Sequence, residues 1–589
     1  MLPSFRTVAE AIAEVGKYYP DHDQVFQDMA GVETRYTYVE VEQATATRAA
    51  NLQALGLRKG DRIGLVVIEP EDFVLSFLAS LRVGVIPVPL YPPMSFASLD
   101  AYHERTAKVL AGAEARMVFV SARLQNVLWS LVDAVPTLEK LVAIENLRSP
   151  APAPIYPEIL PEDVAFLQYT SGSTSDPKGV VVSHASLVAN TSAIIKEGLQ
   201  LDVDKNEKGI SWLPLYHDMG LIGFVIAPIC HGISSVFIPT MRFIKKPSVW
   251  METMHQHRGT ASFAPNFAYA LAMKKATPED LARWDLSCVR VLGCGAEPIH
   301  PETMRQFTDL LSTRCKLPET AIMPAYGMAE ATLAITLNRR NDRMRTMVMD
   351  AESFQHGGAV VAPIDGKPAL EHVSCGAPFA GHEVAAFDDD GNRLPDGREG
   401  ELWHRGPSVT SGYFRNPEAT GSCFRADGWL RTGDLGFVDG GEVFVTGRLK
   451  DLIILNGRNL HPQAVEWAAA DVDGVRKGNV VAFSVPGEAS EQLVIVLESK
   501  DGSPDLGHAV KSSVQKELGV TVADVVCVPA GALPKTSSGK LQRRKTRQQY
   551  LAGELGAEGS RTFGASASRV TLAKHVAKSL WSRAKAAVL

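Results

Sequence analysis

The segment from Val164 to His184 combines residue types that could bind phosphate groups. An apolar lead-in is followed by Thr170-Ser171-Gly172-Ser173-Thr174, and Lys178-Gly179 then precedes a second apolar run. Hydroxyl groups and glycine N–H groups packed this densely offer several donors to phosphate oxygens, and a lysine adds a positive charge. The spacing is not that of a Walker A loop, because Val180 stands where that loop has Ser or Thr. Composition alone also fits a surface loop, but the order of the residues favours a phosphate site.

The elements around this segment alternate between short β-rich runs and helical stretches. Apolar runs at 61–69, 83–90, 117–120, 141–144, 209–213 and 233–239 alternate with helical patterns such as 72–81. This alternation predicts an α/β fold with a largely parallel sheet. From about Gly381 short strand-like pieces separated by Gly and Asp predict a small β-rich subdomain over 381–448. Residues 480–500, 506–517 and 519–529 predict a separate small α+β domain, which begins near 448–451.

Six further motifs follow the phosphate segment in a fixed order. They are GCGAEPI (293–299), AYGMAEAT (325–332), GYFRNPEAT (412–420), WLRTGDLG (429–436), GRLKDLIILNGRN (447–459) and LPKTSSGKLQRR (533–544). Together with YTSGSTSDPKGV (169–180), this set resembles the motifs of the acyl- and aryl-adenylate-forming enzymes. That superfamily contains acyl-CoA synthetases, peptide-synthetase adenylation domains and luciferases. The resemblance implies a large N-terminal adenylation domain (1–448) of parallel and mixed sheets, and a small mobile α+β lid domain (449–552).

The resemblance also implies a reaction, in which a carboxylate attacks the α-phosphorus of ATP to give an acyl-adenylate and pyrophosphate. The expected cofactors are ATP and Mg²⁺, with Glu330 as the metal ligand and Lys450 as the hinge between the domains. The residues expected in catalysis are Lys540, Lys178 and His217. The residues expected to bind the nucleotide are Thr170, Ser171, Gly172, Ser173, Thr174, Lys178, Gly295, Ala296, Glu297, Tyr326 (stacked on adenine), Gly327, Met328, Asp434 (on the ribose hydroxyls), Arg448 and Lys540.

Three stretches are similar to one branch of the superfamily, the fatty acyl-AMP ligases: LYHDMGLIG (215–223), YGMAEATLA (326–334) and LKDLIILNGRNLHPQ (449–463). The resemblance implies that a medium- or long-chain fatty acid is activated and passed to a separate acyl carrier protein or polyketide synthase, and not to coenzyme A. The expected substrate-binding residues are His217, Asp218, Met219, Gly220, Ile222 and Phe263. Residues 339–371 resemble an insertion that restrains the lid in this branch; a long surface loop is the alternative. His461 stands where this branch often has Tyr.

Three other functions remain open on the sequence alone. A fatty acyl-CoA synthetase would share the same motifs and transfer the acyl group to coenzyme A. An amino-acid-activating domain would need an acidic partner for the substrate ammonium, and Asp218 is the nearby candidate. A non-catalytic acyl-nucleotide-binding protein would not need Lys178, Glu330, Asp434 and Lys540 together, so their joint presence favours an enzyme.

Composition excludes several classes of protein. Sixty Lys and Arg residues against 66 Asp and Glu residues give a net charge of −6, which argues against a nucleic-acid-binding protein. The seven cysteines are dispersed without CxxC spacing, so we expect no disulfide scaffold and a cytoplasmic protein.

Two segments raise the question of a membrane. Residues 219–241 contain no charged side chain, but their Gly and Pro residues predict several short buried elements and not one spanning helix. After a linker beginning near 553, residues 566–589 have a basic amphipathic pattern. This pattern suits an anionic membrane or an acidic carrier; a helix docked on its own chain and a disordered tail are the alternatives.

Overall fold

The computed structural model describes residues 4–93, 99–170, 177–202, 205–455, 457–487, 491–499, 504–536, 539–556 and 575–579. Its largest sheet is mixed, with the strand order β17-β14-β13-β12-β11-β9-β10-β1-β2. The strands from β1 to β13 in this order are parallel, and β2, β14 and β17 are antiparallel to their neighbours. The bounds are β1 Asp23–Gln27, β2 Glu33–Thr37, β9 Lys208–Ser211, β10 Ser234–Phe237, β11 Ala261–Ala264, β12 Val291–Cys294, β13 Ile322–Gly327, β14 Ala334–Leu337 and β17 Ala377–Pro378.

A second sheet is entirely parallel, with the order β4-β3-β5-β6. Its strands are β3 Arg62–Val66, β4 Ile86–Pro89, β5 Met117–Val120 and β6 Lys140–Ala143, and the hairpin β7 Val164–Thr170 and β8 Lys178–Ser183 lies next to β4. One hydrophobic cluster contains Val25 and Ile210 of the first sheet and Ile63 and Phe119 of the second. The predicted α/β fold with a largely parallel sheet is therefore confirmed, and a shared core joins the two sheets.

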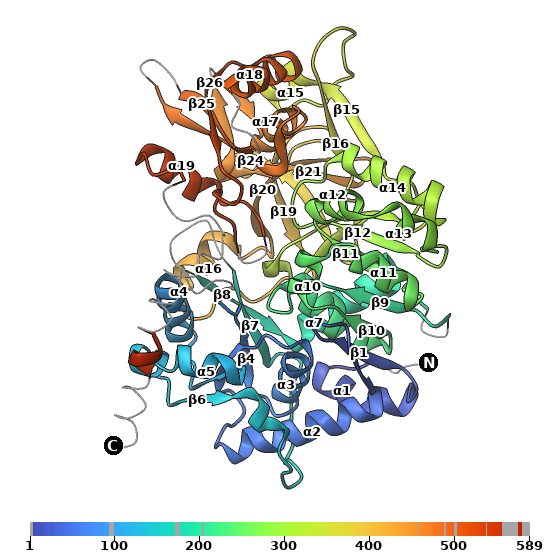
Figure 1. Ribbon diagram of the computed structural model, residues 1–589, viewed down its shortest axis with the longest axis vertical. Helices are drawn as coiled ribbons and strands as arrows, with labels where there is room; N and C mark the ends of the chain where they lie inside the picture. The colour runs from blue at the N-terminus through green and yellow to red at the C-terminus, as the bar shows by residue number, and fades with distance from the viewer. Residues whose placement is uncertain are drawn as a thin grey trace.

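The helices of this part of the chain connect and cover the two sheets (Figure 1). Their bounds are α1 Val8–Tyr18, α2 Tyr38–Ala54, α3 Pro70–Arg82, α4 Leu99–Gly112, α5 Ala122–Leu128, α6 Leu131–Ala134, η2 Ile144–Arg148, α7 His184–Ser192, η3 Ala193–Gly198, α10 Thr240–Lys245, α11 Val249–Gln256, α12 Asn266–Lys275, α13 Pro278–Arg283, α14 Pro301–Cys315 and η6 Ala329–Ala331.

Residues 219–241 are largely buried inside this domain and form several short elements, as predicted. The helical elements among them follow one another without the interruptions that the glycines and prolines suggested. α8 (Asp218–Leu221), the π-helical turn η5 (Ile222–Ile226) and α9 (Ala227–His231) follow one another directly, before β10. Pro228 does not end the run, because the π turn precedes it and such turns accommodate the lost hydrogen bond and the displaced carbonyl. Within the described ranges, no helix has the length and apolarity required to cross a membrane.

The predicted β-rich subdomain is an antiparallel sheet of β18 (Glu383–Phe387), β19 (Gly400–Arg405), β20 (Leu430–Asp439) and β21 (Glu442–Arg448), with α16 (Pro417–Cys423) beside it. The short turn η7 (Leu449–Asp451) follows β21. The lid contains β22 (Ile453–Leu455), β23 (Arg458–Leu460), α17 (Pro462–Ala470), β24 (Val475–Pro486), β25 (Glu491–Ser499), α18 (Pro504–Leu518), β26 (Val522–Val528) and α19 (Arg543–Leu551).

The segment predicted to be an insertion forms a β-hairpin-like unit of β15 (Thr346–Asp350), α15 (Ala351–Gly357) and β16 (Ala369–Val373). Figure 1 places it against the lid, with α15 next to α17 and α18. Met349 and Phe354 of this unit share one hydrophobic cluster with Phe437 of β20 and with Val465 and Ile495 of the lid. This insertion-like unit (residues 346–373), the β-rich subdomain and the lid therefore have a common core in this arrangement.

The described part of the C-terminal tail, residues 575–579, is helical and lies against the N-terminal domain near α4 (Figure 1). His575 Nε2 is 3.0 Å from Asp100 Oδ1 of α4, and His575 and Ser579 are buried. Val576 packs against the core of the second sheet. This part of the tail therefore docks on its own chain, and the rest of the predicted basic helix lies outside the described residues.

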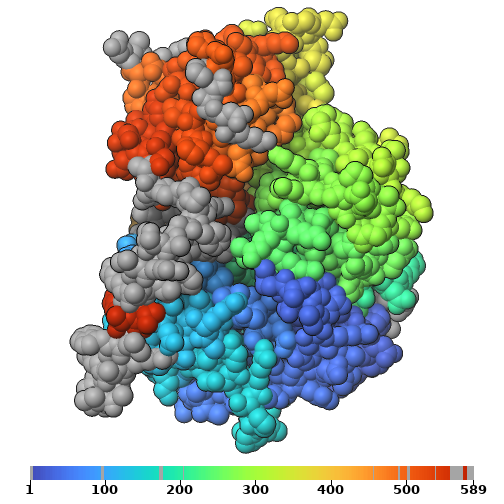
Figure 2. Space-filling view, viewed as in Figure 1, coloured from blue at the N-terminus to red at the C-terminus, as the bar shows by residue number. Residues whose placement is uncertain are grey.

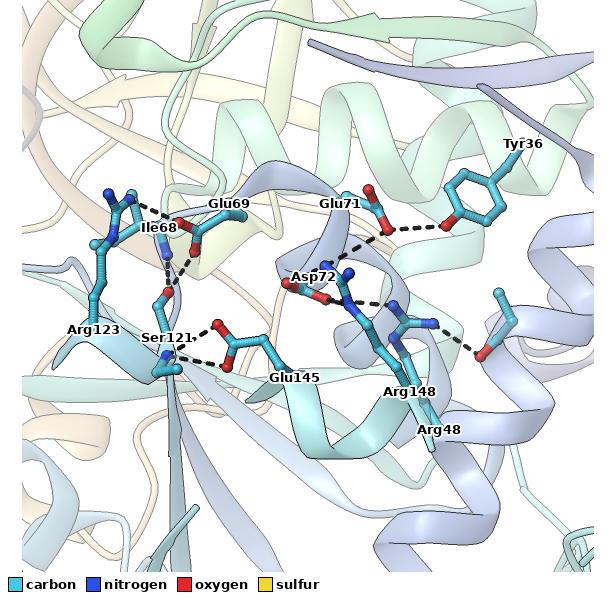
Figure 3. A network of polar contacts seen from close by, with 12 residues as sticks. Tyr36, Arg48, Ile68, Glu69, Glu71, Asp72, Ser121, Arg123, Glu145 and Arg148 are labelled. Atoms are coloured by element: carbon cyan, nitrogen blue, oxygen red, sulfur yellow. Dashed lines mark hydrogen bonds and ion pairs between the residues drawn. The ribbon is translucent and has the colours of Figure 1, made fainter. Parts of the chain in front are cut away.

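Buried charges connect the helices that support the second sheet. Figure 3 shows Asp72 of α3 between two guanidinium groups. Arg148 donates two hydrogen bonds to the Asp72 carboxylate, of 2.8 and 2.6 Å, and Arg48 Nη2 of α2 lies 3.4 Å from it. Asp72 and Arg48 are both almost fully buried. Each buried charge has a partner of opposite sign, so these contacts fix the positions of α2, α3 and η2 relative to one another.

Replacing Asp72 with Ala should destabilise the protein by about 3–5 kcal/mol, because the buried Arg48 guanidinium loses its counter-charge. Urea unfolding followed by tryptophan fluorescence measures the loss. The control is Arg123→Ala, which removes an exposed ion pair with Glu69 and should cost less than about 1 kcal/mol. Equal losses in the two variants would contradict the role assigned to Asp72.

Candidate active site

Most of the predicted site residues that the structure describes meet in one cavity of about 3100 Å³, which lies between the N-terminal domain, the β-rich subdomain and the lid. Figure 2 shows a recess where the orange and red lid faces the green part of the N-terminal domain. The chain segments that follow β9, β11, β12 and β13 all enter the cavity. Ligands of parallel sheets bind at the carboxyl ends of the strands, because the loops there converge.

The hairpin β7–β8 presents the phosphate-binding candidates to this cavity. Thr170 and Lys178 are register partners at the end of the hairpin next to its connecting loop, and both line the cavity. Ser171, Gly172, Ser173 and Thr174 lie outside the described residues. The ammonium nitrogen of Lys178 is 5.0 Å from the centre of the Tyr413 ring, so a cation–π contact orients the lysine.

Glu330, the predicted metal ligand, is connected to the same aromatic side chain. The Tyr413 hydroxyl donates a 2.7 Å hydrogen bond to Glu330 Oε1. Burial raises the pKa of Glu330, and the hydrogen bond from Tyr413 opposes that increase. Tyr413 therefore links the lysine of the phosphate loop to the carboxylate that would hold a cation.

The ribose candidate Asp434 lies in β20 beside two partners. Tyr326 donates a 2.9 Å hydrogen bond to Asp434 Oδ2, and Arg448 Nε lies 3.3 Å from Asp434 Oδ1. Burial raises the pKa of Asp434, whereas Arg448 and Tyr326 lower it. The motif suggested no partner for the Tyr326 hydroxyl, and the structure shows that this hydroxyl positions the Asp434 carboxylate. The stacking of the Tyr326 ring on adenine stays a prediction.

The segment after β12 forms a tightly packed wall next to Tyr326. A Cβ atom at Gly295 would lie 2.8 Å from the carbonyl oxygen of Ala325, so this position requires glycine. Ala296 has φ +71°, and both Ala296 and Glu297 line the cavity. The Glu297 carboxylate accepts backbone hydrogen bonds from Asn266 and Phe267 at the start of α12. Gly327 and Met328 line the cavity beside this wall.

Lys540 enters the cavity from the lid. Its loop is closed by a 2.7 Å hydrogen bond from the Thr536 N–H to the Lys540 carbonyl oxygen. Loss of solvent and the nearby Arg448 lower the pKa of Lys540, whereas the carboxylates of Asp218, Glu297 and Asp434 raise it. The lid is therefore in an arrangement in which its lysine faces the carboxylates of the N-terminal domain.

His217 and Asp218 form a polar pair at the start of α8. His217 Nδ1 lies 2.8 Å from Asp218 Oδ1, and the N–H of Met219 donates a 2.7 Å bond to the same oxygen. Burial alone would raise the pKa of Asp218, but His217, Lys540 and the Met219 N–H lower it below its ordinary value. Asp218 thus already has cationic and hydrogen-bonding partners, and both His217 and Asp218 line the cavity.

The cavity has an apolar part, called here the apolar branch. Its lining includes Met219 and Phe263, together with Ile194, Ile195, Leu199, Phe224, Ile233 and Ala261 in and near the π-helical turns η3 and η5. Gly220 and Ile222 are not part of this lining among the described residues. Gly220 is packed against the Pro214 carbonyl, where a Cβ would lie at 2.4 Å, and the Ile222 side chain is fully buried in the core. The structure thus places these two predicted substrate contacts behind the wall.

Sequence reasoning missed two sets of residues in the site. Tyr413 lies inside the GYFRNPEAT motif, so the motif pointed to its segment but not to its hydroxyl. The apolar residues of η3 have no motif, and the alternation of polar and apolar residues around them is that of an ordinary core helix.

Comparison with known proteins agrees with this geometry. The family model of the AMP-binding enzymes matches residues 12–414. A Caulobacter vibrioides protein, provisionally named as an acyl-CoA synthetase, is 37% identical over 88% of this chain and 91% of its own length. The long-chain-fatty-acid–AMP ligase FadD26 of Mycobacterium marinum is 33% identical over 89% of this chain and 92% of its own.

Among solved structures, one from a study of fatty acyl-adenylate ligases of E. coli and L. pneumophila is similar, with a TM-score of 0.87 and 31% identity. The match covers 94% of this chain and 99% of that chain. The fold and the cavity define an adenylate-forming enzyme that binds ATP. The chain belongs to the AMP-binding enzyme family.

Tyr413→Phe should shift the acid limb of the pH–rate profile to higher pH, because Glu330 loses the hydrogen bond that lowers its pKa. At the acid end the rate should fall about tenfold relative to the unmodified protein, since a hydrogen bond to a charged group contributes about 1.5 kcal/mol. The measurement is ATP–pyrophosphate exchange as a function of pH. The control is Tyr550→Phe, which removes a similar hydroxyl–carboxylate bond to Asp524 in the lid. An unchanged acid limb in Tyr413→Phe would refute the link.

Proposed function

We propose that this protein joins a medium- or long-chain fatty acid to AMP, releasing pyrophosphate from ATP. The observation that carries the proposal is the convergence of Lys178, Glu330, Asp434 and Lys540 on one cavity that continues into an apolar branch. The charged part of the cavity suits a nucleoside triphosphate, and the apolar branch suits an alkyl chain. A non-catalytic binding protein would have no need of the lid lysine in this position.

In the proposed reaction an oxygen of the fatty acid carboxylate forms a bond to the α-phosphorus of ATP. The bond from the α-phosphorus to the bridging oxygen breaks, and the electron pair leaves with pyrophosphate. Two anions must approach each other in this step, so positioning and charge neutralisation provide most of the rate acceleration. The Lys540 ammonium would stabilise the charge between the carboxylate and the α-phosphate, and His217 would orient the carboxylate.

The other residues of the cavity would hold the nucleotide. Thr170 and Lys178 would bind the β- and γ-phosphates, and Asp434 would accept hydrogen bonds from the ribose hydroxyls. Among the described residues, no group of three or more His, Cys, Asp or Glu side chains could hold a metal ion by itself. Mg²⁺ fits a site made of the buried Glu330 carboxylate and phosphate oxygens, since it commonly uses one or two carboxylates plus phosphates. When bound, it would neutralise charge on the phosphates.

We further propose that the acceptor is a carrier protein or polyketide synthase domain, and that coenzyme A is not used. The similarity to FadD26 supports this choice, as does the packing of the insertion-like unit against the lid. The Caulobacter relative supports the alternative, a fatty acyl-CoA synthetase. An amino acid is a poorer substrate, because Asp218 is already engaged by His217.

The seven unpaired cysteines support a reducing location such as the cytoplasm. Contact of the tail with a membrane or a carrier stays a prediction.

Lys540→Ala should reduce adenylate formation by about 10²-fold or more, because the cavity loses the cation that faces the reacting groups. ATP binding should change by less than about threefold, since the other nucleotide contacts remain. Pyrophosphate exchange and calorimetric titration with ATP measure the two effects. Lys511→Ala is the control, because Lys511 is bonded to the Ala523 carbonyl in the lid, away from the cavity. Normal turnover by Lys540→Ala would overturn the role of this lysine.

Product analysis tests the choice of acceptor. Radiolabelled dodecanoate is incubated with ATP and Mg²⁺, with and without coenzyme A, and the products are separated by chromatography. We expect dodecanoyl-AMP in both reactions and no change on adding coenzyme A. Efficient formation of dodecanoyl-CoA would establish the acyl-CoA synthetase function instead, and exchange that depends on an amino acid would establish the third alternative.

A further inference from the structure

A buried contact between a histidine and a glutamate connects the lid to the β-rich subdomain. His461 Nε2 lies 2.8 Å from Glu399 Oε1, and the side chains are 4% and 6% exposed. The Thr446 hydroxyl donates a hydrogen bond to the same carboxylate oxygen. Burial would raise the pKa of Glu399, but His461 and Thr446 hold it below its ordinary value. A carboxylate this deeply buried depends on its partners, because water cannot replace them while the lid stays in place.

The pair lies where three parts of the chain meet. Glu399 belongs to the loop before β19, and its N–H donates a 2.8 Å bond to the Gly358 carbonyl at the end of α15. His461 is the residue that immediately precedes α17 in the lid. The rings of Phe354 and His372, both from the insertion-like unit, lie 6.2 and 6.4 Å from the His461 ring. The imidazole is therefore enclosed by the subdomain and the insertion-like unit together.

The backbone next to the predicted hinge makes room for this imidazole. A Cβ atom at Gly447 would lie 2.6 Å from His461 Nδ1, so a side chain at position 447 would displace the ring. Gly447 is followed directly by Arg448 and then by η7, which contains Lys450. Since His461 lies over the strand that leads into the hinge, a rotation of the lid about the hinge must withdraw the ring from its pocket.

We propose that the Glu399–His461 pair is a positioning pair that holds the lid in the arrangement with Lys540 in the active cavity. Withdrawal of His461 leaves the Glu399 carboxylate with the Thr446 hydroxyl and the nearby His372 ring as the neighbours that favour its charge. Rotation of the lid separates the two side chains, and the loss of their contact opposes the rotation. The pair thus biases the equilibrium of the lid toward the adenylate-forming arrangement. The proposal concerns the position of the lid and does not depend on which acid is activated.

Hydrogen exchange of the full-length protein tests this proposal without substrate. Peptides covering 449–470 are followed by mass spectrometry in the unmodified protein and in Glu399→Gln, His461→Ala and the double variant. We expect each single variant to increase exchange of these peptides about tenfold or more, and the double variant to add little, because residues acting as one pair are not additive. The matched control is Glu371→Gln, which breaks the ion pair between the insertion-like unit and Arg305 of α14 without touching the lid.

Three outcomes would overturn the proposal. They are unchanged exchange in folded Glu399→Gln and His461→Ala, an equal increase in Glu371→Gln, and fully additive effects in the double variant. Thermal unfolding of each variant identifies a general loss of stability, in which case exchange would also rise in peptides of β3 and β5. His461→Phe provides a second test, because its ring fills the pocket but lacks the nitrogen that contacts Glu399. If the contact with Glu399 positions the lid, exchange should increase in this variant. If His461 acts only by filling space, exchange should not change. Failure of the fatty acid proposal would appear in product analysis and would leave these exchange results unchanged.

Discussion

The position of Lys540 is the constraint on which the rest of the structure depends. A lysine from the lid faces Asp218, Glu297 and Asp434, which come from the N-terminal domain and the β-rich subdomain. These carboxylates keep a cation in a cavity that burial alone would make unfavourable for it. In the proposed reaction this cation would lie where the two anionic substrates meet. The arrangement of the lid therefore determines whether Lys540 is present in the cavity. The packing around the predicted hinge stabilises the arrangement in which it is.

The N-terminal domain contributes rigid parts to the site. Two parallel sheets share one core, so the ends of β9, β11, β12 and β13 and the hairpin β7–β8 are fixed relative to each other. Lys178, Tyr413 and Glu330 then form a continuous chain of contacts from the phosphate loop to the metal candidate. Tyr326, Asp434 and Arg448 form a second chain on the ribose side. Each charged side chain is held by a neighbour, which reduces the reorganisation needed when the nucleotide binds.

The lid has a different kind of support. Its hydrophobic core continues into the insertion-like unit and the β-rich subdomain, through Phe354 and Phe437. A lid that shares its core with two neighbouring parts cannot rotate without exposing apolar surface. This packing is non-directional, whereas the pair of Glu399 and His461 specifies one position. The residues of the apolar branch belong to the N-terminal domain, so this part of the cavity wall is built on other elements than the lid.

The sequence by itself determined the fold class and most of the site, because the decisive motifs are local. Short motifs in a characteristic order along the chain contain Thr170, Lys178, Glu330, Asp434 and Lys540. Each of these residues lines the cavity. The tertiary structure decided what these side chains touch. Tyr413 and Glu330 are 83 residues apart, and Tyr326 and Asp434 are 108 apart, so no spacing along the chain indicates their hydrogen bonds. It also decided that Gly220 is packed against the Pro214 carbonyl and that the Ile222 side chain lies in the core. Motifs encode residues that meet a common ligand, whereas contacts between distant segments arise from packing and become defined only when the chain is folded.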